Sequence, residues 1–314
     1  MVAAFTFPGQ GSQLVGMGKM LTEQFAVARM VFEEVDDALG EKLSEIIFEG
    51  PADILTLTAN AQPALMAVSM AVMRVMEQLG FDIKEKVKFV AGHSLGEYSA
   101  LCAAGTLSLA DTARLLRIRG NAMQAAVAVG EGAMAALIGL GEQDVEEICK
   151  TVSEEGICQI ANDNGGGQIV ISGETKAVKA AVEIASKKGA KRALLLPVSA
   201  PFHSSLMQPA ADAMKNAFLT VNKTAPLVPL VANVSVAPES DPEHIVALLV
   251  QQVTGRVRWR ETVEWMYSNG VDTLFEVGCG KVLTGLARRI NKEIKGLTIG
   301  TAEEIETALQ VLGV

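Results

Sequence analysis

The chain has 314 residues, of which 36 are acidic and 27 basic, so its formal net charge is −9. Hydrophobic residues make up 49% of it and charged residues 20%, a balance that suits one large or two moderate folded domains and excludes an intrinsically disordered chain. The acidic balance also excludes a generally basic nucleic-acid-binding protein.

The cysteines are widely separated and include no C-x-x-C pair. This spacing predicts free thiols in a reducing compartment, without a metal site or a disulfide framework. The N-terminal residues lack the basic segment and long apolar stretch of a signal peptide, and no apolar run approaches the roughly 18 residues of a membrane span. We therefore expect a cytoplasmic protein.

The first part of the chain combines two short apolar strands with several helices. Val2–Phe7 is an apolar run stopped by Pro8-Gly9, which predicts a buried strand. A second strand candidate, Val87–Ala91, leads directly into the segment 92–96, after which a helical pattern resumes. The other helices predicted here are Met17–Phe25, Ala28–Leu39, Gln62–Leu79 with Asn60 as its N-cap, and one that Ser108 opens and that ends near Ala126.

Residues 130–198 have a pattern of their own. Strand and helix predictions follow one another in the order β-α-β-β-α-β, which is the order of the ferredoxin-like split motif. The predicted strands are Met134–Ile138, Ile157–Ala161, Gln168–Ser172 and Arg192–Leu196, and the predicted helices are Asp144–Val152 and Lys176–Lys187. We expect a small inserted subdomain over 130–198, within a larger domain made of 1–129 and 199–314.

After Pro197 the alternation of strands and helices resumes. The predicted elements are helix Ser205–Leu219, strand Val228–Val231, helices near 243–251 and 260–268, strand Thr273–Val277 and a helix from about Val282. Such alternation favours a mainly parallel sheet with helices on both faces. The predicted fold class is α/β, with a hydrolase-like core and the ferredoxin-like insert.

The segment Gly92-His93-Ser94-Leu95-Gly96 fits the pattern G-x-S-x-G. A strand leads in and a helix leads out, as a nucleophile elbow requires, and the flanking glycines permit the tight turn. Ser94 is therefore the candidate nucleophile. The alternative reading is an ordinary strand-to-helix turn.

A serine nucleophile needs a base, and the chain offers three histidines. His93 stands beside the serine, which favours a packing role, and His244 lies in a polar helix start. His203 lies in a loop just past a strand and before a helix, where catalytic groups are common. We select His203 as the base, with a structural histidine as the alternative.

An oxyanion produced by acyl transfer needs backbone N–H donors. The N–H of Leu95 points into the elbow at the start of a helix, where the dipole favours negative charge. A second donor is expected from the glycine-rich loop 7–13. That loop lacks the third glycine of a dinucleotide fingerprint and a Walker lysine, so nucleotide binding is disfavoured.

Arg119 lies among alanine, leucine and methionine on a predicted helix. Such an arginine either extends to solvent or binds a fixed anion, and the helix pattern alone favours the first reading.

Six motifs occur in order along the chain: F-P-G-Q-G-S-Q at 7–13, N-A-Q-P-A-L at 60–65, G-H-S-L-G-E-Y-S-A at 92–100, R-G-x-x-M-Q at 119–124, P-F-H-S at 201–204 and E-V-G-x-G-K-V-L-T-G-L at 276–286. On these motifs the chain resembles, over essentially its whole length, the malonyl-CoA:acyl carrier protein transacylases of type II fatty acid synthesis. The resemblance implies the same fold, with a hydrolase-like core and a ferredoxin-like insert.

The resemblance also implies residue roles. Ser94 is then the nucleophile that becomes malonylated, and His203 is its general base and later its general acid. The backbone N–H groups of Gln10 and Leu95 form the oxyanion hole. Arg119 binds the malonyl carboxylate bidentately, a geometry that lysine cannot reproduce.

Further residues follow from the same resemblance. A segment that carries Gln252 orients the second nitrogen of the histidine, in place of an acid. Met123 and Asn164 are implied substrate contacts, and Asn162 borders the site. No cofactor or metal is expected, because the partner protein carries the phosphopantetheine.

The implied enzyme is an S-malonyltransferase that moves the malonyl group from malonyl-CoA to the phosphopantetheine thiol of acyl carrier protein by a ping-pong reaction. The alternatives are a trans-acting polyketide acyltransferase, a serine esterase or thioesterase, and a carrier-protein scaffold. We expect a monomer that binds neither nucleic acid nor membrane. Docking of an acidic carrier protein needs local basic surface, for which the candidates are Lys187, Lys188, Lys191, Arg192, Arg288, Arg289 and Lys292.

Overall fold

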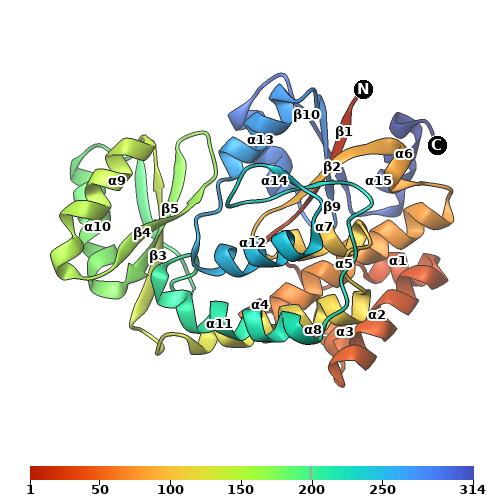
Figure 1. Cartoon of the computed structure of the whole chain (residues 1–314), viewed down its shortest axis with the longest axis horizontal. Coiled ribbons are helices and arrows are strands. Elements are labelled where there is room, and N and C mark those ends of the chain that lie inside the picture. Colours follow the sequence, from red (N-terminus) through yellow and green to blue (C-terminus); the bar gives the residue numbers. More distant parts are fainter. Residues whose placement is uncertain (199) are drawn as a thin grey trace.

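Two separate β-sheets organise the chain in a computed structural model, which describes residues 1–198 and 200–314 (Figure 1). The first has six strands in the order β10-β9-β1-β2-β7-β8, and the second has four in the order β4-β5-β3-β6. The predicted α/β class is confirmed at this level, with a mostly parallel sheet and a separate antiparallel one.

The six-stranded sheet forms the centre of the larger part of the molecule. Its strands are β1 (Ala3–Phe7), β2 (Val87–Gly92), β7 (Leu230–Val231), β8 (Pro238–Glu239), β9 (Thr273–Val277) and β10 (Lys295–Ile299). All neighbours pair in parallel except β7 and β8. Every residue of β1 and β9 is buried, as expected of parallel strands covered on both faces, including the polar residues Thr6 and Glu276.

Helices cover this sheet, and α5 (Thr58–Gln78) is the longest of them, with most of its residues buried. Its alanines and methionines pack against neighbouring helices and supply core volume that the scarce aromatic residues do not. The other helices of this part are α1 (Lys19–Gln24), α2 (Ala26–Leu39), α3 (Leu43–Glu49), α4 (Ala52–Thr56), α6 (Ile83–Lys86), α7 (Gly96–Ala103), α8 (Leu109–Ala125), α11 (Gln208–Ala217), α12 (Pro242–Thr254), α13 (Trp259–Ser268), α14 (Val282–Ile290) and α15 (Ala302–Leu312).

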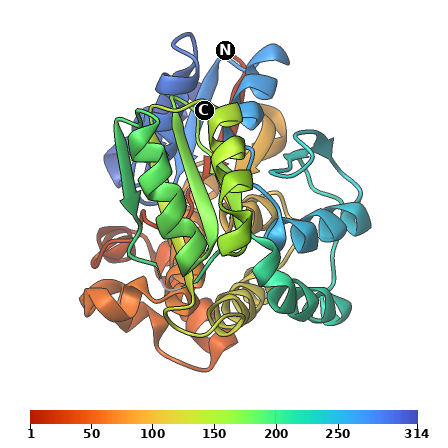
Figure 2. The ribbon, with the colours of Figure 1, turned by 90° about the vertical axis from the view of Figure 1, so that its left-hand side faces the viewer.

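The four-stranded sheet has its own apolar core. Its strands are β3 (Gly132–Ile138), β4 (Cys158–Asp163), β5 (Gln168–Glu174) and β6 (Arg192–Leu195), and its helices are α9 (Glu142–Thr151) and α10 (Thr175–Lys187). All three strand pairings are antiparallel, and the elements follow the predicted chain order. Figure 2 shows α9 and α10 side by side over one face of the sheet.

The structure differs from the predicted elements at a few places. Six helices and strands were not predicted, namely α3, α4, α6, β8, β10 and α15. The strand predicted over Val228–Val231 is reduced to Leu230–Val231, because Pro229 has no N–H to donate to a sheet. The predicted N-cap at Asn60 is wrong, since α5 already begins at Thr58. The amide of Asn60 instead donates to the carbonyl of Ile54, 2.9 Å away.

Within the described ranges, no helix is long and apolar enough to cross a membrane.

Candidate active site

Ser94 lies at the sharp turn between β2 and α7, with a positive φ of 54°. Glycines make this turn possible. A Cβ atom at Gly92 would lie 1.9 Å from the backbone carbon of Gly96, and one at Gly96 would lie 2.2 Å from the carbonyl oxygen of Phe7. The strained serine between two closely packed glycines is the geometry of a nucleophile elbow.

The Ser94 hydroxyl lies 2.8 Å from Nε2 of His203, which belongs to the turn before the short 3₁₀ segment Ser205–Met207. The other ring nitrogen, Nδ1, lies 2.9 Å from the carbonyl oxygen of Gln252 and 3.1 Å from that of Gly255. Carbonyl oxygens only accept hydrogen bonds, so these partners assign the ring proton to Nδ1. Nε2 is therefore free to accept the serine proton.

Burial, together with the nearby positive charge of Arg119 as the second cause, lowers the pKa of His203 to about 3. The imidazole is thus neutral at pH 7, which is the state that a general base requires. No carboxylate among the described residues bonds to this ring, and two backbone carbonyls occupy the place that an aspartate has in a catalytic triad.

Arg119, on α8, is only 1% exposed although it carries a charge. Its Nη1 donates to Oε1 of Gln62 at 2.8 Å, and its Nη2 donates to Oε1 of Gln252 at 2.8 Å. Nη2 also lies 3.1 Å from the Ser94 hydroxyl. Both amide partners are neutral, and Nε has no hydrogen-bond partner in the part of the chain that the structure describes. The guanidinium charge therefore remains available to an anion beside the serine.

The backbone N–H groups of Gln10 and Leu95 donate to no residue that the structure describes. Both residues line the cavity that contains Ser94, and Leu95 stands at the N-cap of α7. Two unused N–H donors near a nucleophile, one of them at a helix start, match the requirement for an oxyanion hole.

The cavity around Ser94 has a volume of about 660 Å³. Residues from both parts of the molecule line it, since Met134 of β3 and Asn162 of β4, in the four-stranded sheet, share this lining with Ser94 and His203 of the larger part. Met123 also lines it, and its sulfur accepts from the Gln62 amide at 3.8 Å. A cavity of this size accommodates an extended acyl thioester arm.

Two predicted site residues lie behind the cavity wall. Asn164 does not line the cavity; its Oδ1 lies 2.9 Å from Nε2 of His93 and fixes that buried ring. Gln252 reaches the site through its backbone carbonyl at His203 and its side chain at Arg119. The third histidine, His244, is exposed and pairs with Glu239.

Two residues of the site carry no assignment from the sequence. Glu97, three residues after the serine, is buried, and burial raises its pKa to about 8. Asn233, in the loop after β7, is buried and its Oδ1 accepts the backbone N–H of Ser94 at 3.0 Å. Glu97 belongs to the G-H-S-L-G-E motif, so the sequence could have indicated its position beside Ser94. No sequence motif identifies Asn233.

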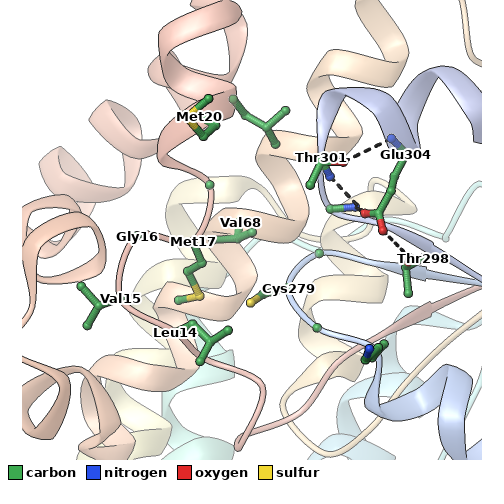
Figure 3. A pocket seen from close by; sticks show the side chains of 16 residues that line it. Leu14, Val15, Gly16, Met17, Met20, Val68, Cys279, Thr298, Thr301 and Glu304 are labelled. Atoms are coloured by element: carbon green, nitrogen blue, oxygen red, sulfur yellow. Dashed lines mark hydrogen bonds between the residues drawn. The ribbon is translucent and has the colours of Figure 1, made fainter.

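A second cavity, of about 520 Å³, lies on the other side of the loop that carries Gln10 (Figure 3). Its walls are mostly apolar, with Leu14, Met17 and Val68 around Cys279, whose thiol donates to the carbonyl of Ser12 at 3.0 Å. It contains no pair of nucleophile and base, so the cavity around Ser94 is the candidate active site. In the described part of the chain, no three His, Cys, Asp or Glu side chains gather as a metal ion would require.

The chain is similar to known proteins over nearly its whole length. The family model "Acyl transferase domain" matches residues 4–309. The "Malonyl CoA-acyl carrier protein transacylase" of Bacillus subtilis is 46% identical over 310 residues, covering 98% of this chain and 96% of that protein. A crystal structure of an acyl-carrier-protein-S-malonyltransferase from Bartonella henselae is 84% identical, with a TM-score of 0.99 and complete coverage (100%) of both chains. A malonyl-transacylase in complex with its type II PKS acyl-carrier protein is 41% identical, with a TM-score of 0.96 over 99% of this chain and 100% of that one.

Proposed function

Because this chain belongs to the acyl transferase family, and within it to the malonyl CoA-acyl carrier protein transacylases, we propose that it transfers malonyl groups from malonyl-CoA to the phosphopantetheine thiol of an acyl carrier protein. The transfer supplies fatty acid biosynthesis. The observation that carries this assignment is the buried guanidinium of Arg119, which lies 3.1 Å from the Ser94 hydroxyl, donates otherwise to the neutral amides of Gln62 and Gln252, and lies over the Tyr98 ring.

The first half-reaction forms an ester on Ser94. As the hydroxyl oxygen attacks the thioester carbonyl of malonyl-CoA, Nε2 of His203 takes its proton. The N–H groups of Gln10 and Leu95 stabilise the negative oxygen of the tetrahedral intermediate. The carbon–sulfur bond then breaks, and the leaving sulfur of CoA receives the proton from His203.

The second half-reaction runs the same chemistry in reverse with a different thiol. The phosphopantetheine thiol of the carrier protein loses its proton to His203 and attacks the malonyl ester. The bond between the acyl carbon and the Ser94 oxygen breaks, and His203 returns the proton to the serine. The enzyme needs no cofactor of its own in this scheme.

Arg119 selects the acyl group. In a malonyl group, one CH₂ separates the carboxylate carbon from the carbonyl carbon that Ser94 attacks. A cation next to the serine hydroxyl is therefore close enough to bind the carboxylate. A charge-assisted, bidentate contact in a buried site is strong. This contact orients the malonyl group so that its thioester carbonyl lies at the Ser94 hydroxyl. An acetyl group has no carboxylate, so the charge of Arg119 does not stabilise its binding.

We extend the proposal to the architecture. The elbow after β2 in a parallel sheet supports a hydrolase-like core formed by 1–129 and 199–314, although Ser199 lies outside the described residues. The strand order β4-β5-β3-β6 with two helices on one face supports a ferredoxin-like subdomain over 130–198. The proposed enzyme is a cytoplasmic monomer.

A second candidate is a trans-acting acyltransferase of polyketide assembly, which uses the same chemistry on a different carrier protein. It is favoured by one observation, the similarity to a malonyl-transacylase bound to a type II PKS carrier protein. An esterase or thioesterase is disfavoured by the buried arginine, which a simple ester does not need.

Intact-mass measurement after mixing with malonyl-CoA and with acetyl-CoA tests the proposal. Wild type is expected to gain a malonyl adduct that an added acyl carrier protein removes, and Ser94→Ala is expected to gain none. Arg119→Ala should lose malonyl transfer at least tenfold more than acetyl transfer. Release of free malonate in place of transfer would indicate a hydrolase, and the absence of any adduct would indicate a scaffold.

A further inference from the structure

Glu97 is a buried carboxyl group that the proposed reaction does not use. It lies on α7, one turn after Ser94, and is 1% exposed. It forms no ion pair with any residue in 1–198 or 200–314. Burying a carboxylate without a cation in contact costs stability, so the groups that it does contact indicate its role.

Its first contact leads to the nucleophile. Oε1 of Glu97 accepts the backbone N–H of Asn233 at 2.6 Å. The side chain of Asn233 in turn binds two backbone groups of the elbow. Its Oδ1 accepts the Ser94 N–H at 3.0 Å, and its Nδ2 donates to the carbonyl of Gly92 at 2.7 Å. The strained serine is thus tied to Glu97 through one residue.

Its second contact leads to the guanidinium. The other oxygen, Oε2, accepts Nε2 of Gln252, which also donates to the Ser94 carbonyl at 2.9 Å. Because two acceptors surround the NH₂ end of this amide, its oxygen is turned toward Arg119, whose Nη2 donates to it at 2.8 Å. Arg119 therefore meets a neutral amide oxygen, while the Glu97 carboxyl group contacts the other end of that amide.

This separation preserves the charge of Arg119 for a ligand. A carboxylate in direct contact would form an ion pair with the guanidinium and compete with a bound anion for it. An inverted Gln252 amide would place its NH₂ against the guanidinium, donor against donor, and displace it from the serine. The Glu97 carboxyl group prevents the inversion of the Gln252 amide, and it does so without forming an ion pair with Arg119.

We propose that Glu97 is a positioning residue for acyl selectivity, which fixes the Gln252 amide so that Arg119 faces the serine with its charge unpaired. This inference rests on the proposed function. Glu97 touches no reacting atom, so its effect must pass through Gln252 and Arg119 and must depend on whether the acyl group carries a carboxylate.

The substitution Glu97→Gln tests this with almost no change in volume. A glutamine offers one acceptor oxygen to two N–H donors, so it meets either Asn233 or Gln252 with its own NH₂. The backbone N–H of Asn233 cannot turn away, whereas the Gln252 side chain can. The contact that breaks is therefore the one that orients Arg119.

Rates of acyl transfer to Ser94 are measured by intact mass with malonyl-CoA and with acetyl-CoA. In Glu97→Gln, the ratio of malonyl to acetyl rates is expected to fall at least tenfold, with the acetyl rate within about threefold of wild type and a higher KM for malonyl-CoA. A ratio within twofold of wild type overturns the inference. Equal losses of both rates also overturn it, because they mean that Glu97 serves only the elbow.

A double variant separates positioning from packing. Glu97→Gln with Gln252→Glu keeps a hydrogen bond between the two side chains but places a carboxylate directly on Arg119. The malonyl-to-acetyl ratio should stay at or below that of the single variant. Recovery to the wild-type ratio would mean that only the contact between positions 97 and 252 matters, and would overturn the inference. This variant also carries the test if Glu97→Gln alone does not fold.

Ser99→Ala is the matched control, because Ser99 is a buried polar residue of the same helix outside the site. Both rates should be unchanged in it. Failure of wild type to form any malonyl ester would overturn the proposed function and this inference together. A wild-type ester with an unaltered ratio in Glu97→Gln would overturn the inference alone.

Discussion

Three ionisable side chains of the site are buried together, and burial acts on each in the direction set by its charge. It lowers the pKa values of His203 and Arg119, because their protonated forms are charged, and raises that of Glu97, because its deprotonated form is charged. At neutral pH the histidine is therefore an uncharged base beside a guanidinium. A substrate carboxylate that neutralises Arg119 would make the imidazole easier to protonate as it takes the serine proton.

The pKa of His203 gives a prediction about pH. Its folded value of about 3 lies below the ordinary 6.5, so the unfolded chain binds the proton more readily. The stability that this group contributes is present above pH 6.5 and is lost as the pH falls from 6.5 toward 3. Titration of the His203 ring by NMR should show no protonation between pH 7.5 and about 5.

Substitution of the neighbouring charge provides the control. Arg119→Leu removes the second cause of the shift and should raise the pKa of His203, while desolvation keeps it below the ordinary value. A wild-type midpoint near 6.5 would contradict the prediction and would mean that water reaches the ring.

The sequence predicted the reactive residues better than the residues that hold them. Ser94 and His203 stand in local motifs whose geometry is set by nearby glycines and turns, and the structure brings them to 2.8 Å. Gln62 and Asn233 contact the site through buried hydrogen bonds that span 57 and 139 positions. Gln62 stands in the motif at 60–65, but the motif does not show which residue it contacts, and no local pattern marks Asn233. The fold alone decides which buried amide meets which group of the site.

Among the elements, close backbone approaches at glycines bring the site together. Gly96 lets α7 approach β1, and Gly120 lets α8 approach the first turn of α5, where a Cβ atom would lie 2.6 Å from the Cα of Ala59. The second approach carries Arg119 next to Gln62. A side chain at either glycine would push apart two elements that hold catalytic and binding groups.

Two glycine-to-alanine substitutions, expected to change the free energy of unfolding in opposite directions, test this packing. In Gly96→Ala, the new Cβ would meet the carbonyl oxygen of Phe7 at 2.2 Å, which should cost on the order of 3 kcal/mol of unfolding free energy. Gly285 lies inside α14, with its nearest neighbour 4.0 Å from a Cβ position. Gly285→Ala should therefore stabilise the protein by about 0.5–1 kcal/mol.

Urea unfolding measures both changes on one scale. Equal midpoints for wild type and Gly96→Ala would show that α7 shifts away from β1 at no cost, contrary to the close packing described above.

The element predictions succeeded where a pattern is local and failed where tertiary contacts decide. β9 was predicted over the same residues that it occupies, because its buried apolar residues Leu274, Phe275 and Val277 fall within one short segment. α5 begins at Thr58 without any side-chain cap, because packing against α8 extends it past Asn60. β10 is half-exposed at a sheet edge and carries no clear period, so it was missed.

On the scale of the whole molecule, basic residues from two distant segments lie around one turn. Gly139 lies against the Lys191 side chain and donates its N–H to the carbonyl of Gly167 at 2.8 Å, and Gly166 lies against Arg289. This turn joins β4 to β5, next to the cavity residue Asn162. A chain of net charge −9 thus has a basic surface beside its site. Lys188 is not part of it, since it pairs with Asp144 and Glu147.

Charge reversal on this surface should weaken docking of an acidic carrier protein. Lys191→Glu or Arg289→Glu is expected to raise the apparent KM for acyl carrier protein about three- to tenfold at low salt and less at high salt. The KM for malonyl-CoA and the rate of Ser94 acylation should be unchanged. Steady-state transfer at two ionic strengths measures both.

Lys84→Glu is the matched control, because Lys84 is exposed on α6, at the other end of the molecule from the four-stranded sheet (Figure 1). If the reversed Lys191 and Arg289 variants match it at low salt, this surface does not receive the carrier protein.

The orientation of His203 by carbonyl groups of the main chain also affects how the enzyme tolerates genetic change. In an enzyme whose histidine is aligned by an aspartate, a single codon change deletes the aligning group. Here every amino acid at positions 252 and 255 brings a carbonyl oxygen with it, so no missense mutation at these positions removes the acceptor itself. Gln252 can therefore vary in its selectivity role during evolution while the general base keeps its tautomer.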